Sequence, residues 1–341
     1  MKRLRMILGT LAVLIILGIM LSLFLKNRKG EEEAVTKDIA GTEAQGPASV
    51  EAQEIKYTES EGGKTLWEIV AKEAKFYQDK GVTDFKNIQV TFYYKDNYEL
   101  HLLGEEGDLN NETKDINLRK NVTITMSNDY VLKTDSLNYN AVTKKISTDA
   151  PITITGPDIN FAGEGLSFDL GKDELFINSD IVTDFTGKKG SKPQGDTSET
   201  AGFDDVTSLE GTLHVTSGGL YGNQKLNYIQ YTNGVIASHR EATLRAGTVT
   251  IYFKKNMKDI TRIEARGNVR LVRSDITATC GLLTFDYEKK LLTLENNPVI
   301  VRGEDKITGD KILYYLDEKK SVALGGEKAR AHVTIYPKEK F

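Results

Sequence analysis

A short phrase that recurs along the chain constrains the fold more than any other feature of the sequence. An Asn, Asp or Pro is followed, directly or after a Gly, by β-branched or aliphatic residues at alternating positions. The phrase begins at Asn87, Asn121, Pro151, Asp180, Asn233, Asn268 and Pro298. Its spacing is about 30 residues apart from one wider gap, and such self-similarity is the signature of a repeat architecture. The period of two between turn residues predicts stacked β-hairpins, which form a long groove with open ends.

Composition narrows the classes of partner and chemistry. The 341 residues are 39% hydrophobic and 28% charged, which is typical of folded material and allows two domains. A net charge of −4 argues against a nucleic-acid partner, which would favour a basic face. The single cysteine, Cys280, rules out an intramolecular disulfide.

The N-terminal segment has the length and character of a membrane span. Met6 to Leu25 carries no charge, and at about 1.5 Å per residue a helix of this length spans roughly 30 Å, the thickness of a bilayer core. A cleaved signal peptide is the alternative, but no small-x-small cleavage site follows, and basic residues begin at Lys26. We expect residues 1–30 to be a transmembrane anchor with a cytoplasmic N-terminus. Gly18 and Ser22 form a small-xxx-small pair that either contacts a transporter helix or has no role beyond anchoring.

Composition also divides the rest of the chain. Residues 31–54 are acidic and poor in large apolar residues, so they predict a flexible spacer. Residues 187–204 are rich in Gly, Ser and charge and predict a linker or long surface loop. Two β-rich domains, 55–186 and 205–341, flank this linker. One stretch departs from the β pattern: Trp67 to Gln78 contains good helix formers at passable helical spacing, and by itself it predicts a helix.

No catalytic constellation is present in the sequence. The histidines His101, His214, His239 and His332 are scattered, and none has a metal-ligand spacing. The segment Gly63-Lys64-Thr65 lacks the earlier glycine of a phosphate loop. We therefore predict a protein that is not an enzyme and has no cofactor or metal.

The order of several weaker motifs behind the anchor resembles the periplasmic bridge proteins of lipopolysaccharide export. The first half is similar to the membrane-anchored component, LptC, in Trp67-x-x-x-Ala71-x-x-Ala74-x-x-Tyr77, Gly104-x-x-Gly107, Thr134-Asp135-x-Leu137-x-Tyr139 and Gly163-x-Gly165-Leu166. The second half is similar to the soluble, OstA-like component, LptA, in Ala265-x-Gly267-Asn268-Val269, Leu294-x-x-Asn297-Pro298-Val299 and Ile307-x-Gly309-Asp310-x-Ile312. The usual anchored component ends near residue 187, so this chain resembles either a fusion of two bridge modules or a long variant with an extended second domain.

This resemblance implies a fold and a function. The fold would be all-β, with two twisted, open β-jellyroll domains, and the Trp67 stretch would then be a strand. The protein would sit in the inner membrane with most of its chain in the periplasm. It would accept lipopolysaccharide from an inner-membrane ABC transporter complex and pass it along a hydrophobic groove toward the outer membrane. The alternative is an anchored structural scaffold with a dry β-core and protein partners only.

The resemblance also identifies candidate site residues. Inward apolar positions either form a dry core or line the lipid groove: Ile88, Val90, Phe92, Val122, Ile124, Ile152, Ile154 and Phe168 in the first half, and Val249, Ile251, Phe253, Val269, Leu271, Phe285, Val299 and Val301 in the second. The last strand, with Val333 and Ile335, is either an edge that pairs with the next bridge protein or an edge protected by the charged tail. Gly163 and Gly165 permit close backbone approach at the groove or a junction, or are simple turn glycines.

Overall fold

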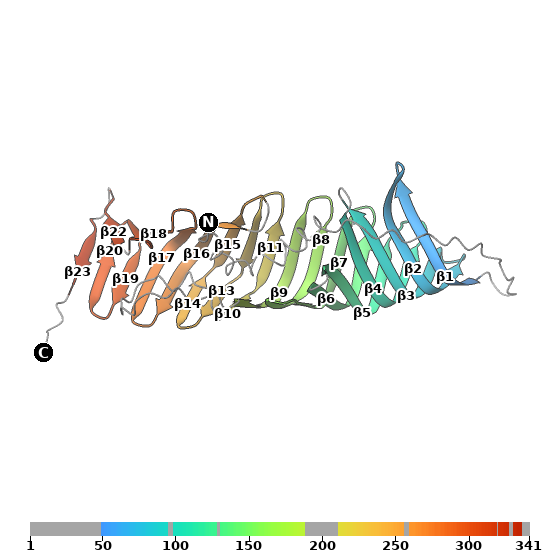
Figure 1. The fold of residues 1–341 in the computed structure, drawn as a ribbon, viewed down its shortest axis with the longest axis horizontal. Coiled ribbons are helices and arrows are strands. Elements are labelled where there is room, and N and C mark those ends of the chain that lie inside the picture. Colours follow the sequence, from blue (N-terminus) through green and yellow to red (C-terminus); the bar gives the residue numbers. More distant parts are fainter. Residues whose placement is uncertain are drawn as a thin grey trace, which may run out of the picture. The chain divides into compact units, whose positions relative to one another are not determined.

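The computed structural model describes residues 49–94, 98–127, 130–187, 211–255, 259–318, 320–326 and 330–335. These residues form strands and turns without any helix, as Figure 1 shows, so the all-β prediction is confirmed. Within these ranges no helix is long and apolar enough to span a membrane. The predicted anchor, with Gly18 and Ser22, lies outside the described residues, and so does nearly all of the predicted linker.

The described residues divide into two compact units. The N-terminal unit contains residues 49–157 and 164–175, and the C-terminal unit contains residues 158–163 and 176–335. The division falls within the β8–β9 hairpin. The predicted domain boundary at 187–204 stays a prediction, because the structure describes only its first residue.

The N-terminal unit is built on seven consecutive antiparallel strands, each paired with the next. They are β1 (Ser49–Glu61), β2 (Lys64–Tyr77), β3 (Val82–Tyr94), β4 (Tyr98–Asn110), β5 (Ile116–Ser127), β6 (Tyr130–Asn140) and β7 (Lys145–Thr155). Residues 49–54, predicted as the end of the spacer, are strand instead. Pairing with β2 supplies the backbone hydrogen bonds that a free spacer would make with water.

The recurring Asn phrase marks a bend inside a long strand. Asn87 in β3 and Asn121 in β5 have left-handed backbones, with φ of 49° and 51°. Asn adopts this conformation at lower cost than most residues. The extra residue shifts the alternation, so that Phe85 before the bend and Ile88 after it both face the interior. The turn predicted at this phrase is therefore a bend within one strand.

The bends divide the N-terminal unit into two arms that face each other. The ring of Phe92, after the bend of β3, lies 4.6 Å from the ring of Tyr139, which belongs to the opposite arm of β6. Gly107 of β4 lies against Ile88, and an added Cβ there would meet the Ile88 side chain at 3.1 Å. Apolar side chains from both arms thus fill the space between them.

The C-terminal unit has more, shorter strands. Besides parts of β8 (Ile159–Asp169) and β9 (Glu174–Gly187), it contains β10 (Gly211–Ser217), β11 (Gly219–Asn223), β12 (Tyr228–Thr232), β13 (Val235–His239), β14 (Ala242–Ala246), β15 (Thr248–Phe253), β16 (Ile260–Arg273), β17 (Ile276–Asp286), β18 (Leu291–Glu295), β19 (Val299–Arg302), β20 (Asp305–Thr308), β21 (Lys311–Tyr315), β22 (Lys320–Leu324) and β23 (His332–Thr334).

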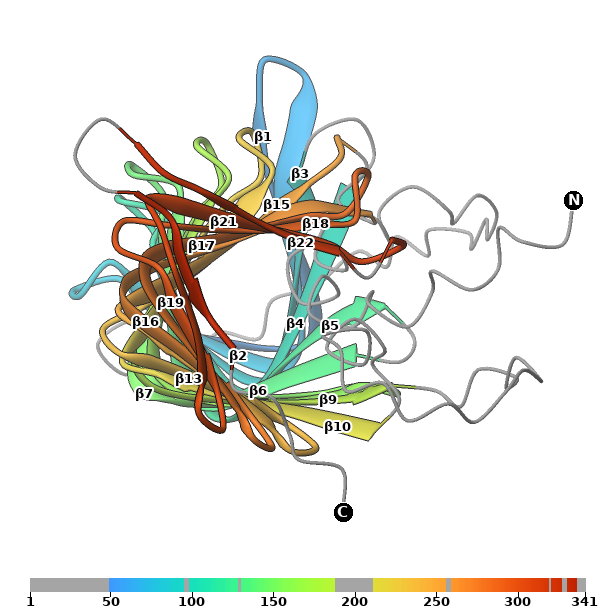
Figure 2. The same ribbon diagram turned by 90° about the vertical axis from the view of Figure 1, so that its left-hand side faces the viewer.

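Hydrogen bonding arranges these short strands in two arms. One arm has the order β9-β10-β13-β14-β16-β17-β19-β20-β23, and the other has the order β9-β11-β12-β15-β16-β17-β18-β21-β22. The long strands β9, β16 and β17 take part in both arms. Figure 2 shows β18, β21 and β22 in one arm and β13 and β19 in the other, meeting at an angle.

The second half begins by pairing with the end of the first. β10 pairs with β9 in antiparallel register from Gly211 opposite Gly187 to Ser217 opposite Ile181. The residues between these two strands therefore connect neighbours in one sheet, whatever path they take. Sequence composition cannot reveal this pairing, because it joins segments separated by more than 20 residues that carry no strand pattern.

The helix predicted from residues 67–78 alone is wrong. The segment lies in β2, paired with β1 on one side and β3 on the other, as the family resemblance implies. Its buried residues Trp67, Ile69 and Ala71 alternate with more exposed ones, which is the period of a strand. Pairing along both edges and burial of Trp67 outweigh the helix propensity of its Ala, Glu and Lys residues.

Candidate functional site

The interior of the N-terminal unit is apolar and tightly closed. Seven of the residues predicted to line a groove are buried there: Ile88, Val90, Phe92, Val122, Ile124, Ile152 and Ile154, all at most 3% exposed. Phe168 is only half-buried. The same interior contains residues that sequence analysis did not select, among them Leu102, Leu109, Ile116, Leu118, Leu132 and Leu137. Ile116 and Leu118 in β5, and Leu137 and Tyr139 in β6, are two residues apart with a more exposed residue between them, so the period of two was a signal for them.

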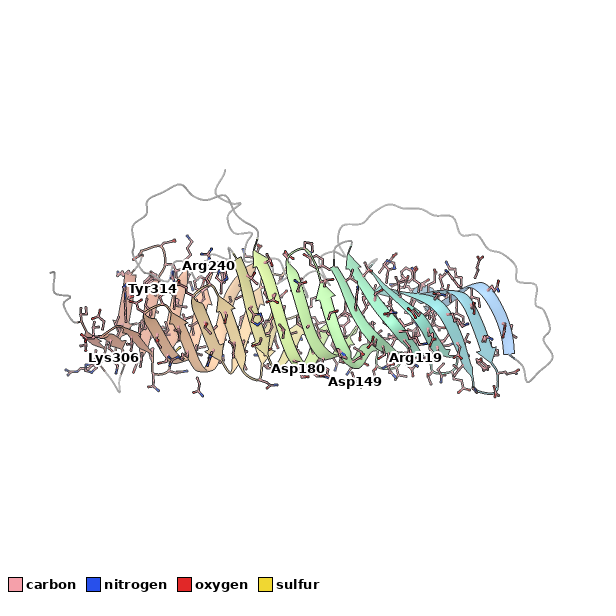
Figure 3. The ribbon with its side chains drawn as sticks, turned by 90° about the horizontal axis from the view of Figure 1, so that it is seen from below. Arg119, Asp149, Asp180, Arg240, Lys306 and Tyr314 are labelled. Atoms are coloured by element: carbon pink, nitrogen blue, oxygen red, sulfur yellow. The ribbon has the colours of Figure 1, made fainter. Side chains whose placement is uncertain are left out.

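The C-terminal unit also has an apolar interior. Five of the residues selected from the sequence are buried there: Val249, Ile251, Phe253, Val269 and Leu271. The same interior contains residues that sequence analysis did not select: Ile276, Ala278, Cys280, Leu283, Leu292, Leu294, Ile312 and Tyr314. Tyr314 is labelled in Figure 3. Phe285 is half-buried.

Exposure of the inward residues is slightly higher away from the bends in several strands of both units. In β16 of the C-terminal unit it increases from 1% at Val269, beside the bend, to 6% at Leu271. In β4 of the N-terminal unit it increases from 1% at Leu102 to 8% at Leu100. All of these side chains are buried, so both interiors are closed by protein.

Val299 and Val301 do not belong to this interior. Both are half-buried, whereas Ile300 between them is buried. Asn296 and Asn297 both have left-handed backbones, so the bend before β19 spans two residues. A run of three aliphatic residues after such a bend does not reveal which of them faces inward, and only the pairing of Ile300 with buried Ala278 decides it.

Two ionisable groups in the C-terminal interior are held neutral. Burial raises the pKa of the Cys280 thiol to about 11, although hydrogen bonds with the backbone of Leu282 and Glu295 act to lower it. Burial also raises the pKa of the Tyr231 phenol to about 12. Neither group carries charge near neutral pH, so the interior offers an apolar ligand no charged contact at these positions.

Charged side chains lie on the outside of both units. Lys86 pairs with Glu73 at 3.1 Å, and Arg119 pairs with Asp108. Figure 3 shows Arg119 of the N-terminal unit and Arg240 and Lys306 of the C-terminal unit extending from the ribbon. Within the described residues, no group of three or more His, Cys, Asp or Glu is arranged to hold a metal ion.

The terminal strands have edges that are not paired within the described residues. β23 pairs with β20, with Val333 opposite Ile307, and no second partner of β23 occurs in these ranges. Val333 is 56% exposed, and Ile335, just beyond the strand, is also exposed. At the other end, β1 pairs with β2 alone among these strands. The geometry allows strand addition at either edge, and the predicted role of Val333 and Ile335 stays a prediction.

Gly163 and Gly165 differ in what their backbones require. A Cβ added at Gly163 would lie 2.9 Å from the side chain of Ile177, so this position packs too closely for a larger residue. Gly165 has a left-handed backbone, with φ of 69°, which glycine adopts without strain. One glycine serves close approach and the other a bend, and their role at a junction stays a prediction.

Two family models match the sequence. The model described as lipopolysaccharide-assembly, LptC-related, matches residues 11–184, and the model described as LptA/(LptD N-terminal domain) LPS transport protein matches residues 214–320. No curated protein matches the chain. One similar solved structure is LptH, the LptA homologous periplasmic component of the lipopolysaccharide transport device of Pseudomonas aeruginosa. It is 16% identical, with a TM-score of 0.32, and the match covers 37% of this chain and 95% of that one.

Proposed function

We propose, because this chain belongs to the LptC-related family of lipopolysaccharide assembly, that it carries lipopolysaccharide across the periplasm. Its second half is similar to LptA and the LptD N-terminal domain, which are transport proteins for the same molecule. Residues 6–25 anchor the chain in the inner membrane as a single span with a cytoplasmic N-terminus. An inner-membrane ABC transporter complex loads lipopolysaccharide onto the N-terminal unit, and the interior of the chain passes it toward the outer membrane.

The observation that carries this proposal is an apolar interior in each unit, surrounded by charged outer faces. A buried acyl chain of twelve carbons gains on the order of 10 kcal/mol from leaving water. Affinity therefore needs no specific polar contact, and the sugar and phosphate groups stay in water. Similar apolar sites in series allow the lipid to move on without any chemical step, so the proposed carrier is not an enzyme.

The closed state of the N-terminal interior supports the second candidate, a scaffold with a dry core. Residues such as Val90 and Leu132 are fully buried by protein alone, so lipid enters only if the two arms separate. Separation costs the packing free energy of the side chains involved, which offsets part of the gain from acyl burial. The same holds for the C-terminal unit, where Leu271 and Leu292 are also buried.

Strand addition is the proposed means of linking this chain to the next bridge protein. The unpaired edge of β23 offers backbone hydrogen-bonding groups to an incoming strand, and the edge of β1 offers a second site. The interior of one protein then continues into the next without a covalent link.

Site-specific photocrosslinking in cells tests the proposal. A photoreactive residue replaces the inward Ile124 in the N-terminal unit or the inward Leu271 in the C-terminal unit. The matched controls replace the half-buried Thr123 and the exposed Arg270, which are one residue away on the same strands. A carrier gives lipopolysaccharide adducts at both inward positions and few at the controls.

Each other result has a defined meaning. Adducts at Ile124 alone would make the C-terminal unit a docking module. Protein adducts at the control positions, with no lipid adduct at either inward position, would reject the carrier and leave the scaffold.

A further inference from the structure

A row of aromatic rings crosses the outer face of one arm of the C-terminal unit. The rings of Phe176 in β9 and Tyr221 in β11 lie 4.7 Å apart, and those of Tyr221 and Tyr228 in β12 lie 5.6 Å apart. Tyr228 and Tyr252 in β15 follow at 5.9 Å, and the guanidinium of Arg262 in β16 lies 4.2 Å from the centre of the Tyr252 ring. We call these five side chains the aromatic row.

The aromatic row is not part of the interior. Phe176 is 44% exposed, and its neighbours Leu175 and Ile177 are buried on the other face. Tyr228 and Tyr252 are direct cross-strand partners and are half-buried, whereas Ile229 and Ile251 beside them face inward. The rings therefore cover the solvent side of the sheet.

Polar side chains lie in the adjacent row of the same face. Register places Tyr221 opposite Gln230, Gln230 opposite Thr250, and Thr250 opposite Glu264. The Gln230 amide donates to Thr250 Oγ1 at 2.9 Å. Glu264 is buried on this face beneath Arg262 and Arg266, whose guanidinium groups lie 3.1 Å and 2.8 Å from its carboxylate oxygens. The face thus combines aromatic rings with an amide and two oriented guanidinium groups.

The chemistry of this face is that of a saccharide platform. Aromatic rings offer flat apolar surface to the C–H face of a sugar ring, and phenol, amide and guanidinium groups offer hydrogen bonds to its hydroxyls. Aromatic pairs that only stabilise a sheet do not need oriented polar groups beside them. In the N-terminal unit, by contrast, the ring pairs Tyr57–Trp67 and Phe92–Tyr139 each include a buried ring and belong to packing.

The position of the row suits a ligand whose acyl part lies in the interior. Tyr228 is the first residue of β12, Tyr252 is next to the end of β15, and Phe176 follows the turn that opens β9. All three therefore lie close to hairpin turns, at the free end of their arm and away from the bends. A saccharide that leaves the interior between the free ends of the arms meets this outer face first.

We propose that the aromatic row binds the saccharide part of the transported glycolipid. This inference rests on the proposed function, and it assigns the saccharide a path on the outer face of the C-terminal unit beside the acyl path in its interior. The row then holds the sugar chain against the protein, and Arg262 and Arg266 donate to its hydroxyl or acidic groups.

The test uses the full chain in detergent and a deacylated lipopolysaccharide oligosaccharide, which has no lipid part to enter the interior or the micelle. Saturation-transfer NMR and titration calorimetry measure its binding. The variants are Tyr228→Thr with Tyr252→Thr, which keep residues that favour strands, and Phe176→Ser, which changes the most exposed ring. Tyr93→Ala, an exposed outward tyrosine of the N-terminal unit, is the matched control.

We expect the wild type and the control to bind the oligosaccharide. Phe176→Ser should bind about tenfold more weakly, the ratio that corresponds to one lost aromatic contact, and the double tyrosine variant should bind at least tenfold more weakly, because it loses two rings. Acyl crosslinking at Leu271 should be unchanged in folded variants. Absence of oligosaccharide binding by the wild type, with lipid crosslinking intact, would overturn this inference alone. Absence of lipid adducts at both Ile124 and Leu271, when photoreactive residues replace them in the otherwise unchanged chain, would instead overturn the proposed function. Equal binding by the row variants and the wild type would place the saccharide elsewhere.

Discussion

Single residues with left-handed backbones define the repeat of this chain. Asn87, Asn121, Asp180, Asn233 and Asn268 all have φ between 49° and 61°, and each belongs to one copy of the recurring phrase. Asn and Asp are the side chains that reach this region most readily after glycine. The phrase therefore marks the positions where strands bend, and aliphatic residues after it again face inward at alternating positions.

A substitution at Asn268 tests this role. Asn268→Ala should lower the free energy of unfolding by about 1 kcal/mol, because alanine pays the steric cost of the left-handed region. Asn268→Gly should be close to neutral, because glycine adopts this backbone freely. Urea denaturation of both variants measures the difference. Equal destabilisation by both would mean that the Asn side chain, and not its backbone, holds the bend.

The buried phenol of Tyr231 predicts a loss of stability in alkali. Its pKa is raised from 10.0 to about 12 by burial, so the folded state disfavours the charged form. The stability that the neutral phenol contributes is complete below pH 10 and disappears as the pH rises from 10 through 12. The free energy of unfolding then falls by at most about 3 kcal/mol. Tyr231→Phe should be less sensitive than the wild type over this range. Parallel curves of unfolding free energy against pH for the two proteins would contradict the assignment.

At the scale of elements, pairing decides structure where local preference is ambiguous. β2 contains good helix formers and is nevertheless a strand, because β1 and β3 pair along both of its edges. β10 finds its place by pairing with β9 across the intervening chain. At the opposite end, β23 pairs along one edge within the described residues and leaves the other available.

A charge on the last strand tests strand addition. Val333→Lys should weaken association with the next bridge protein at least several-fold, because lysine at an exposed edge opposes pairing. Its melting temperature should stay near that of the wild type, because Val333 is exposed. The control is Val142→Lys, at an exposed hairpin turn that is far from Val333 in the sequence. Co-purification with the partner measures the effect, and normal association of Val333→Lys would exclude this edge.

At the scale of the whole molecule, one chain contains two apolar interiors, and both are closed by protein. Their inward residues are buried to a similar degree, as Leu100 of the N-terminal unit is 8% exposed and Leu271 of the C-terminal unit is 6% exposed. If both interiors carry acyl chains, the arms of each unit must separate to admit lipid.

The native cysteine reports on occupation of the second interior. Cys280 is buried and its thiol has a pKa of about 11, so alkylation near neutral pH should be slow and should accelerate about tenfold per pH unit up to that value. Saturating lipopolysaccharide should slow alkylation of the folded chain further, by covering the thiol. Mass spectrometry of iodoacetamide-treated protein gives the rates. Lipid that leaves the rate unchanged would place the acyl chains away from Cys280.

The sequence by itself determined the all-β class, the positions of the bends and many of the inward residues, because twelve of the sixteen positions selected from the sequence are buried. These depend on local physical chemistry: a period of two, and Asn or Gly where the backbone turns left-handed. Tertiary structure decided three other matters that no local pattern settles. It placed Ile300, and not Val299 or Val301, in the interior; it made Trp67 part of a strand; and it joined β10 to β9. Each depends on pairing with another strand, and no local pattern encodes the register of that pairing.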